Sequence, residues 1–237
     1  MATTLSPADR AKRAAALAAL EYIEDGMTLG LGTGSTAAFL VEGLGRRVGE
    51  GLKVRCVATS SGTAAQATRL SIPLLGLDEA GPLDLVIDGA DEFDPQLRLI
   101  KGGGGALLQE KIVAAAARRM VVISDASKEV ARLGAFPLPI EVVRFGCLST
   151  ARTVATVLDR ADVETRTLTW RQRDGAFLVT DEGHHILDAH LGRIGDPGAL
   201  ASALVQVPGV VETGLFLGLA SEVLIGSEDG HVRRFPG

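Results

Sequence analysis

The sequence has few cysteines, few aromatic residues and no long uninterrupted apolar run. Its two cysteines, Cys56 and Cys147, lie far apart without metal-ligand spacing, which predicts small reduced core thiols rather than a disulfide framework. Charges interrupt the most apolar stretches, as Glu212 and Glu222 do in residues 210–226, so no segment is long enough to cross a bilayer. We therefore expect no membrane partner.

Lysine is sparse, and positive charge comes mainly from arginine. The formal net charge is −5, which argues against a nucleic-acid surface because such a surface needs a concentrated basic stripe. There are only five lysines: Lys12, Lys53, Lys101, Lys111 and Lys128. An anionic substrate would therefore have to be bound by local donors. No cationic start followed by an apolar stretch marks a secretory signal, so we expect a cytoplasmic protein.

Strands and helices alternate in the first half of the chain. Ser6 and Pro7 form a helix-start signature, and the Ala/Leu-rich run that follows ends near Asp25. Further helices are predicted at 35–48, 61–70 and 105–118, and strands at 27–32, 53–59, 84–88 and 120–124. The continuous Val/Ile runs suit a parallel sheet covered on both faces. This half is predicted to be α/β.

The pattern changes after residue 131 and predicts a small α+β domain. Strands are expected at 140–144, 164–171, 177–180 and 186–189, and helices at 148–158 and 197–205. The last strands, at 210–217 and 223–226, are expected to return to the first sheet. The predicted domains are therefore 1–131 plus 209–237, with 132–208 as an insertion. The four histidines are interpreted mainly as surface or hairpin residues.

The first motif is the glycine-rich turn from Gly30 to Ala37. Glycines let the backbone approach an anion, while free N–H groups, the helix dipole and hydroxyls favour a phosphate. Gly32, Gly34 and Ala37 also satisfy a loose dinucleotide fingerprint, but Thr59 follows the next strand where such a site would want an acidic residue. A tight turn without a ligand is the other alternative.

The second motif runs from Asp88 to Glu92, directly after an apolar strand. Carboxylates at the carboxyl end of a parallel strand lie where open α/β sheets bind ligands, and neighbouring like charges separate acid and base roles. The alternatives are a solvated acidic loop and a metal site, although no further ligand stands close in sequence.

The third motif is Lys101 followed by four glycines and a helix that carries Glu110. It is not a P-loop, because the lysine precedes the glycines. The glycine N–H groups beside Lys101 suit charge developing on a sugar oxygen, and Glu110 suits a general base. A surface glutamate paired with an arginine is the commoner fate of such a residue. Lys128 follows the next apolar strand.

Six ordered motifs together resemble the signature of type A ribose-5-phosphate isomerases: GLGTGSTA, TSSGT, DLVIDGADE, LIKGGGGALLQEKI, SDASK and LPIEV. The resemblance covers nearly the whole chain and extends to PGVVETGLF and VLIG. It implies a Rossmann-like parallel sheet flanked by helices, with an inserted ferredoxin-like α+β domain. It further implies assembly as a homodimer or homotetramer and a reaction that needs no metal or cofactor. A fourth glycine, Gly105, departs from the family pattern without touching an implied role.

The resemblance also implies an activity, the interconversion of D-ribose 5-phosphate and D-ribulose 5-phosphate through a cis-enediolate in the non-oxidative pentose phosphate pathway. Glu110 is the implied proton acceptor, with Asp88, Asp91 and Lys101 as further catalytic residues. The implied substrate-binding residues are Thr33, Gly34, Ser35, Thr36, Asp88, Gly89, Ala90, Asp91, Lys101, Gly102, Gly103, Gly104 and Lys128. We assign ring opening to Asp88, although Asp91 is an alternative.

Two other functions fit the same sequence features. A non-catalytic sugar-phosphate sensor would use the same phosphate turn, but the chain shows no added DNA-binding segment and has an acidic balance. A related acyl-CoA transferase or amino-sugar-phosphate deaminase would share the sheet. The former would form a covalent thioester with a carboxylate, and the latter would release ammonia.

Overall fold

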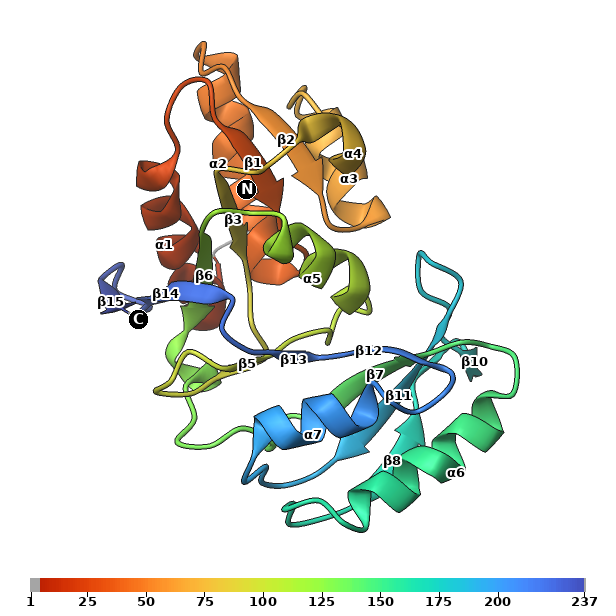
Figure 1. The fold of residues 1–237 in the computed structure, drawn as a ribbon. Helices are drawn as coiled ribbons and strands as arrows, with labels where there is room; N and C mark the ends of the chain where they lie inside the picture. Colours follow the sequence, from red (N-terminus) through yellow and green to blue (C-terminus); the bar gives the residue numbers. More distant parts are fainter. Residues whose placement is uncertain (1–4, 237) are drawn as a thin grey trace. The chain divides into compact units, whose positions relative to one another are not determined.

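The computed structural model describes residues 5–236, which fold into two compact units (Figure 1). Unit 1 comprises Met1–Ala90, Gln109–Glu129 and Gly218–Gly237, and unit 2 comprises Asp91–Leu108 and Val130–Leu217. Among the described residues, no helix combines the length and the apolar character needed to cross a membrane.

Unit 1 contains most of the predicted strand–helix alternation. Its elements are α1 (Pro7–Ala19), η1 (Leu20–Tyr22), β1 (Thr28–Leu31), α2 (Ser35–Gly49), β2 (Arg55–Ala58), α3 (Ser61–Arg69), α4 (Leu77–Ala80), β3 (Leu85–Asp88), β6 (Met120–Asp125), η2 (Ala126–Lys128), β14 (Ala220–Gly226) and β15 (Val232–Pro236). Helix α5 (Leu107–Ala115) begins in unit 2 and continues in unit 1 from Gln109.

The strands of unit 1 form one sheet in the order β15-β14-β6-β3-β1-β2. All neighbours pair in parallel except β15, which is antiparallel to β14. The chain runs from β1 outward to β2 and then returns to β3 on the other side of β1. In doubly wound sheets, ligands bind at such a switch point, outside the carboxyl ends of the strands. The predicted Rossmann-like α/β fold is confirmed.

Helices cover both faces of this sheet. The side chains of β1 alternate between the two faces and pack against a helix on each. Leu29 and Leu31 are buried in one core with Leu40 of α2. Gly30 faces the other way, where a Cβ atom would come within 2.6 Å of Val113 in α5. A glycine in the central strand therefore lets α5 lie close to the sheet.

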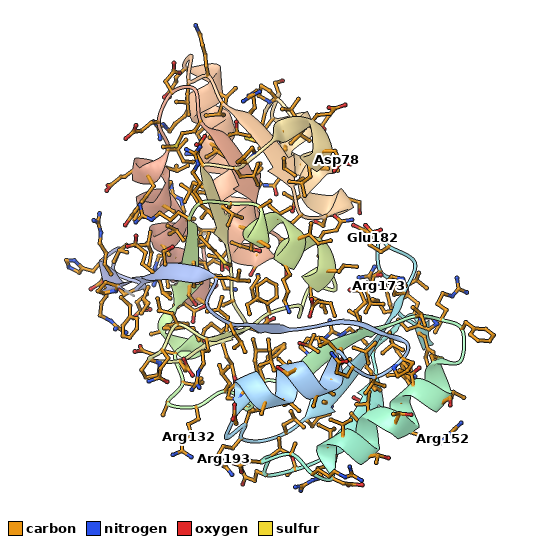
Figure 2. The ribbon with its side chains drawn as sticks, in the orientation of Figure 1. Asp78, Arg132, Arg152, Arg173, Glu182 and Arg193 are labelled. Carbon is orange, nitrogen blue, oxygen red and sulfur yellow. The ribbon has the colours of Figure 1, made fainter. Side chains whose placement is uncertain are left out.

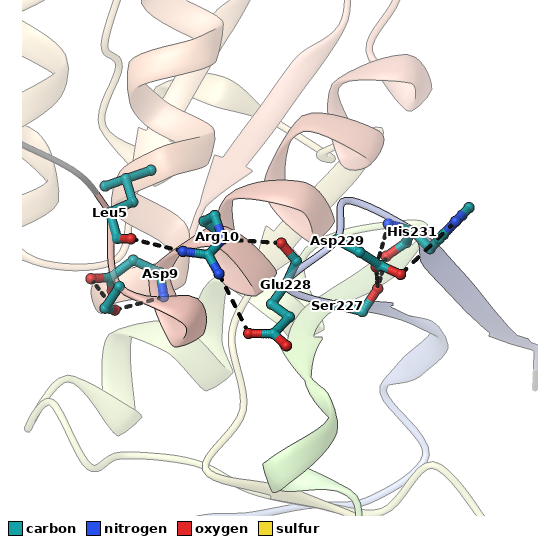
Figure 3. Close-up of polar contacts among 8 residues, drawn as sticks. Leu5, Asp9, Arg10, Ser227, Glu228, Asp229 and His231 are labelled. Atoms are coloured by element: carbon teal, nitrogen blue, oxygen red, sulfur yellow. Dashed lines mark hydrogen bonds and ion pairs between the residues drawn. The ribbon is translucent and has the colours of Figure 1, made fainter. Parts of the chain in front are cut away.

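The predicted helix start at Ser6–Pro7 is confirmed, and a contact distant in sequence reinforces it (Figure 3). The Ser6 hydroxyl accepts a hydrogen bond from the Asp9 N–H at 3.1 Å, and Pro7 occupies the first helical turn. The Arg10 guanidinium donates to the carbonyls of Leu5, at 3.0 Å, and Glu228, at 3.1 Å. Helix α1 is thereby attached to the turn between β14 and β15.

Unit 2 is built around an antiparallel sheet in the order β12-β7-β11-β8. Its elements are β4 (Glu92–Phe93), β5 (Leu99–Ile100), β7 (Leu138–Val142), α6 (Cys147–Leu158), β8 (Thr167–Trp170), β9 (Gln172–Arg173), β10 (Ala176–Phe177), β11 (His185–His190), α7 (Pro197–Leu204), β12 (Val210–Thr213) and β13 (Leu215–Phe216). The succession β7-α6-β8-β11-α7-β12 is the ferredoxin-like arrangement that was predicted.

The two faces of this sheet are covered differently. Leu187 and Ala189 of β11 are buried in a core that includes residues of α6 and α7. Ile186, which points to the opposite face, packs with Leu107 and Leu178. The segment leading into α5 therefore lies on the face of the sheet that α6 and α7 leave uncovered.

The units divide the chain differently from the predicted domains. Residues 91–108 and 209–217, predicted to belong to the first domain, lie in unit 2. Strand β13 pairs with β5, and β12 pairs with β7. The spacing of apolar residues along a strand is the same whichever sheet the strand joins. The sequence therefore did not indicate these pairing partners. Strand β10 likewise ends at Phe177 and pairs with β9, whereas the prediction had a longer strand there.

His184 lies in a hairpin turn, as predicted, since the Thr180 N–H donates to its carbonyl at 2.9 Å, and its ring also contacts a buried carboxylate. Its Nδ1 lies 3.0 Å from Oε1 of Glu141, a carboxylate that is 1% exposed, and the Thr180 hydroxyl donates to the same oxygen at 2.9 Å. Burial raises the pKa of Glu141 above its ordinary value, and the contacts with His184 and Thr180 oppose this rise.

Cys56 is buried as predicted, and Cys147 is partly buried.

We expect Glu141→Gln to flatten the pH dependence of folding stability. Because the pKa of Glu141 is raised in the folded state, folding favours the protonated carboxyl. Stability should therefore fall as the pH rises from the ordinary value of 4.5 through the raised one. Urea unfolding at about pH 5 and about pH 8 should show a smaller difference for Glu141→Gln than for the unmodified protein. Equal differences would contradict this expectation.

Candidate active site

Asp88 joins the carboxyl ends of β1 and β3 at the switch point of the unit 1 sheet. The side chain is 1% exposed. Its Oδ1 accepts hydrogen bonds from the Thr33 N–H at 3.0 Å and the Gly89 N–H at 2.7 Å. The Gly32 N–H donates to the Ile87 carbonyl at 3.0 Å and continues the strand pairing up to this point. One carboxylate thus fixes the turn after β1 against the turn after β3.

Gly32 leaves the space that Asp88 occupies. A Cβ atom at position 32 would lie 2.1 Å from Asp88 Oδ1. We expect Gly32→Ala to lower the free energy of unfolding by about 1–3 kcal/mol, with a loss of activity, because Asp88 must move. Gly49→Ala is the control, since nothing lies within 4 Å of a Cβ there. Thermal unfolding of both variants tests this, and equal midpoints would contradict it.

The Thr33 hydroxyl lies inside a cluster of hydroxyls. Thr33 Oγ1 is 2.8 Å from Thr59 Oγ1, 2.8 Å from Ser60 Oγ and 3.2 Å from Thr63 Oγ1. Ser60 also caps α3, and the Thr63 hydroxyl donates to the Gly32 carbonyl at 3.0 Å. The cluster braces the turn after β1 and occupies the place where a dinucleotide site would have an acidic residue. Thr63 was not among the predicted site residues, although its place at the end of the TSSGT motif was a usable signal.

Helix α2 begins directly after this turn. Its N-cap is Gly34, so no side chain accepts a hydrogen bond from the first helical N–H groups. Gly34 and Ser35 are exposed, and Thr36 is partly exposed. The end of a 15-residue helix with uncapped N–H groups and two hydroxyls is suited to an anion such as a phosphate.

Glu110 is not the surface residue that the commoner interpretation expected. It lies in the first turn of α5 and is 4% exposed. Lys128 ends the short helix η2, which follows the carboxyl end of β6, and it is partly buried. Burying a carboxylate costs free energy of desolvation. The burial of Glu110 therefore indicates a functional role rather than that of a surface charge.

Lys101 in unit 2 is also buried. It follows β5, is 2% exposed, and its Nζ lies 5.4 Å from the centroid of the Phe216 ring. Its N–H donates to the Gly214 carbonyl at 2.9 Å. The Phe216 ring and the Gly214 carbonyl, which lies between β12 and β13, hold Lys101 at the start of the glycine segment.

The segment 102–105, called the glycine loop below, forms a turn before α5. The Gly105 N–H donates to the Gly102 carbonyl at 3.0 Å, and the Gly103 N–H donates to Asp91 Oδ2 at 2.7 Å. The turn delays the helix, which starts at Leu107 rather than at residue 105 as predicted. Asp91 therefore engages one of the three N–H groups predicted to bind substrate.

The acidic motif is not a solvated loop, because each of its carboxylates holds a different backbone segment. Asp88 and Asp91 have the partners described above. Glu92 is 3% exposed and accepts from the N–H groups of Gly134, at 2.7 Å, and Phe136, at 2.5 Å. Burial raises the pKa of Glu92, and these N–H donors oppose the rise. Within residues 5–236, no three His, Cys, Asp or Glu side chains are placed to hold a metal ion.

The predicted site residues thus fall into two sets. Unit 1 supplies the switch-point residues Thr33, Gly34, Ser35, Thr36, Asp88, Gly89 and Ala90, together with Glu110 and Lys128. Unit 2 supplies Asp91, Lys101, Gly102, Gly103 and Gly104. The covalent steps from Ala90 to Asp91 and from Leu108 to Gln109 link the two sets.

Comparison with known proteins identifies the family. The sequence profile of ribose 5-phosphate isomerase A (phosphoriboisomerase A) matches residues 55–230. Ribose-5-phosphate isomerase A of Ruegeria sp. (strain TM1040) is 58% identical over 233 residues, which cover 98% of this chain and 89% of that protein.

Solved structures agree. Ribose 5-phosphate isomerase from Plasmodium falciparum superposes with a TM-score of 0.91 at 34% identity, over 97% of this chain and 99% of that one. A D-ribose-5-phosphate isomerase in complex with phospho-erythronic acid gives a TM-score of 0.91 at 34% identity, over 98% and 100% of the two chains. The chain belongs to the ribose 5-phosphate isomerase A family and is an aldose-ketose isomerase of ribose 5-phosphate.

Proposed function

We propose that Glu110 is the base that moves the proton between C2 and C1 of the substrate. The observation that carries this proposal is its burial, 4% exposed, in the first turn of α5. In the open-chain sugar, the carboxylate removes the C2 proton and a cis-enediolate forms. The same group then returns the proton to C1, while the proton of the C2 hydroxyl passes to O1 as C2 becomes the carbonyl. One base is sufficient because both carbons are neighbours. Hydrogen bonds from water make a carboxylate a weaker base. Burial shields the carboxylate from these hydrogen bonds.

The phosphate would bind at the start of α2. The uncapped helix N-terminus, the hydroxyls of Ser35 and Thr36, and the cation of Lys128 supply the donors. The Thr33 hydroxyl has its partners in the cluster with Thr59, Ser60 and Thr63, so we assign it to bracing the turn.

Asp88 would open the furanose ring by proton exchange, and Asp91 would orient a hydroxyl. Both carboxylates already accept hydrogen bonds from glycine N–H groups, which fixes their orientation before substrate arrives. Lys101 and the Gly104 N–H of the glycine loop would stabilise the negative oxygen of the enediolate. Phospho-erythronic acid, bound by the relative above, supports an enediolate intermediate because its carboxylate resembles the charged enediolate.

The proposed binding and proton-transfer groups are separable by kinetics. Lys128→Met should raise KM for ribose 5-phosphate by about tenfold or more with kcat largely kept, because a charge-assisted contact to the phosphate is lost in ground and transition states alike. Glu110→Gln should do the reverse. If Lys128→Met lowered kcat and left KM unchanged, Lys128 would serve the transition state instead of the phosphate.

We also infer a homo-oligomer, a dimer or a tetramer, in the cytoplasm. Support comes from large apolar side chains exposed on unit 2, Phe145 at 93% and Leu148 at 57%. Sedimentation of the purified chain should give a mass of two or four times 24.6 kDa, and a monomer would contradict the inference.

A further inference from the structure

The side chain of Arg171 connects two elements of unit 2. It follows β8 and forms a two-pronged ion pair with Asp188 of β11: Nε donates to Oδ2 at 2.9 Å and Nη2 to Oδ1 at 2.5 Å. Both side chains are mostly buried, at 15% and 14% exposed. Asp188 alternates with Leu187 and Ala189, which face α6 and α7, so the pair lies on the other face of the sheet.

The same guanidinium reaches the glycine loop. Its Nη1 donates to the Gly102 carbonyl at 2.6 Å and to the Gly103 carbonyl at 3.1 Å. Asp188 thus occupies two nitrogens of Arg171 and leaves the third to hold two consecutive peptide groups. Arginine suits this task because its planar fork presents several donors in a fixed geometry.

These contacts determine where the loop N–H groups point. A peptide group is planar and trans, so its C=O and N–H point in opposite directions. Holding the Gly102 carbonyl toward Arg171 directs the Gly103 N–H away from it, to Asp91. Holding the Gly103 carbonyl likewise directs the Gly104 N–H away from Arg171. Among the described residues, the Gly104 N–H has no acceptor, which leaves it available to a ligand.

The glycine loop needs such a clamp because its own residues impose little preference. Glycine has no Cβ and populates many backbone conformations, so peptide groups between successive glycines rotate readily. Gly102 has a φ of 104°, which lies in the left-handed region. Hydrogen bonds from a fixed guanidinium select one of the accessible orientations and also polarise the peptide groups they hold.

We propose that Arg171, fixed by Asp188, is a positioning residue for the isomerisation, and that it aims the Gly104 N–H at the oxygen that becomes negative in the enediolate. This inference rests on the proposed role of the glycine loop. Arg171 touches no reacting atom and acts through the two peptide groups that it holds.

Kinetics of Arg171→Ala test the inference. The expected result is a fall in kcat of about 10- to 100-fold, with KM for ribose 5-phosphate changed by less than about threefold, because the phosphate binds elsewhere. Arg171→Lys should fall comparably, since a lysine keeps the charge but cannot hold Asp188 and two carbonyls together. Arg173→Ala is the control: Arg173 is exposed on β9 of the same hairpin and should leave kcat unchanged (Figure 2).

Two readouts separate positioning from mere stability. Guanidinium ion at a non-denaturing concentration should restore part of kcat to Arg171→Ala, whereas sodium ion at equal ionic strength should not. In protein labelled with ¹⁵N-glycine, the Gly103 and Gly104 amide resonances should shift in Arg171→Ala and stay in place in Arg173→Ala. A kcat of Arg171→Ala within about twofold of that of the unmodified chain would overturn the inference. A loss of kcat that guanidinium ion does not partly restore would also overturn the inference.

Lys101→Met, assayed in parallel, distinguishes the two ways of failing. If Lys101→Met loses turnover while Arg171→Ala and Arg171→Lys do not, the clamp is wrong and the role of the loop stands. If all three variants keep turnover, the proposed role of the glycine loop fails, and the inference fails with it.

Discussion

Replacing Glu110 with glutamine is expected to lower kcat by about 10²- to 10⁴-fold or more, with KM for ribose 5-phosphate nearly unchanged. Glutamine has almost the same shape and can fill the buried position, but it cannot accept the C2 proton. The loss therefore falls on proton transfer and not on binding. Initial rates over a range of substrate concentrations give both constants.

Glu129→Gln is the matched control for Glu110→Gln. Glu129 is an exposed carboxylate of the same unit, ion-paired with Arg233, and its replacement removes the same charge from the chain. It should keep kcat. A Glu110→Gln variant that retains more than about a tenth of the normal rate would remove Glu110 as the base.

Lys101→Met should give the second large effect, a fall in kcat of about 10²- to 10³-fold with a small change in KM. Methionine fills the buried volume beside Phe216 but brings no charge to the developing enediolate oxygen. Affinity for phospho-erythronic acid should fall with kcat, because its carboxylate presents a similar negative charge. Lys53→Met, at an exposed lysine of unit 1, is the control. An unchanged kcat with a raised KM would make Lys101 a simple anchor for substrate.

Local features of the sequence were sufficient to predict most of unit 1. The glycine turn, the N-cap at Ser6 and the apolar strand that ends at Asp88 depend on neighbouring residues, and the structure has them close to the expected positions. The switch point follows from the order of strands, and the first two motifs stand at carboxyl ends of strands, where such sheets bind ligands.

Partners distant in sequence could not be predicted in the same way. Strands 210–213 and 215–216 pair within unit 2, although their apolar pattern fits either sheet. Arg171 and Asp188 are 17 residues apart, and their ion pair appears only when β8 and β11 lie side by side. A usable signal was present, since Asp188 is a charged residue among the apolar residues of the strand predicted at 186–189.

The hydroxyl cluster shows that a motif in the sequence does not reveal which partners its side chains have. The resemblance to the isomerase family implied a substrate contact for Thr33. In the structure its hydroxyl contacts Thr59, Ser60 and Thr63, three residues that follow the neighbouring strand β2. The spacing of hydroxyls was visible in the sequence, but whether they face a ligand or one another depends on the packing of two loops.

The measurement that tests Glu110 most directly is proton NMR of ribose 5-phosphate in D₂O, with a chelator present, for the unmodified chain and Glu110→Gln side by side. The account predicts ribulose 5-phosphate with deuterium incorporated from solvent in the first sample, and neither product nor exchange at C2 over the same time in the second. Exchange at C2 at a comparable rate with Glu110→Gln would contradict it and require another base.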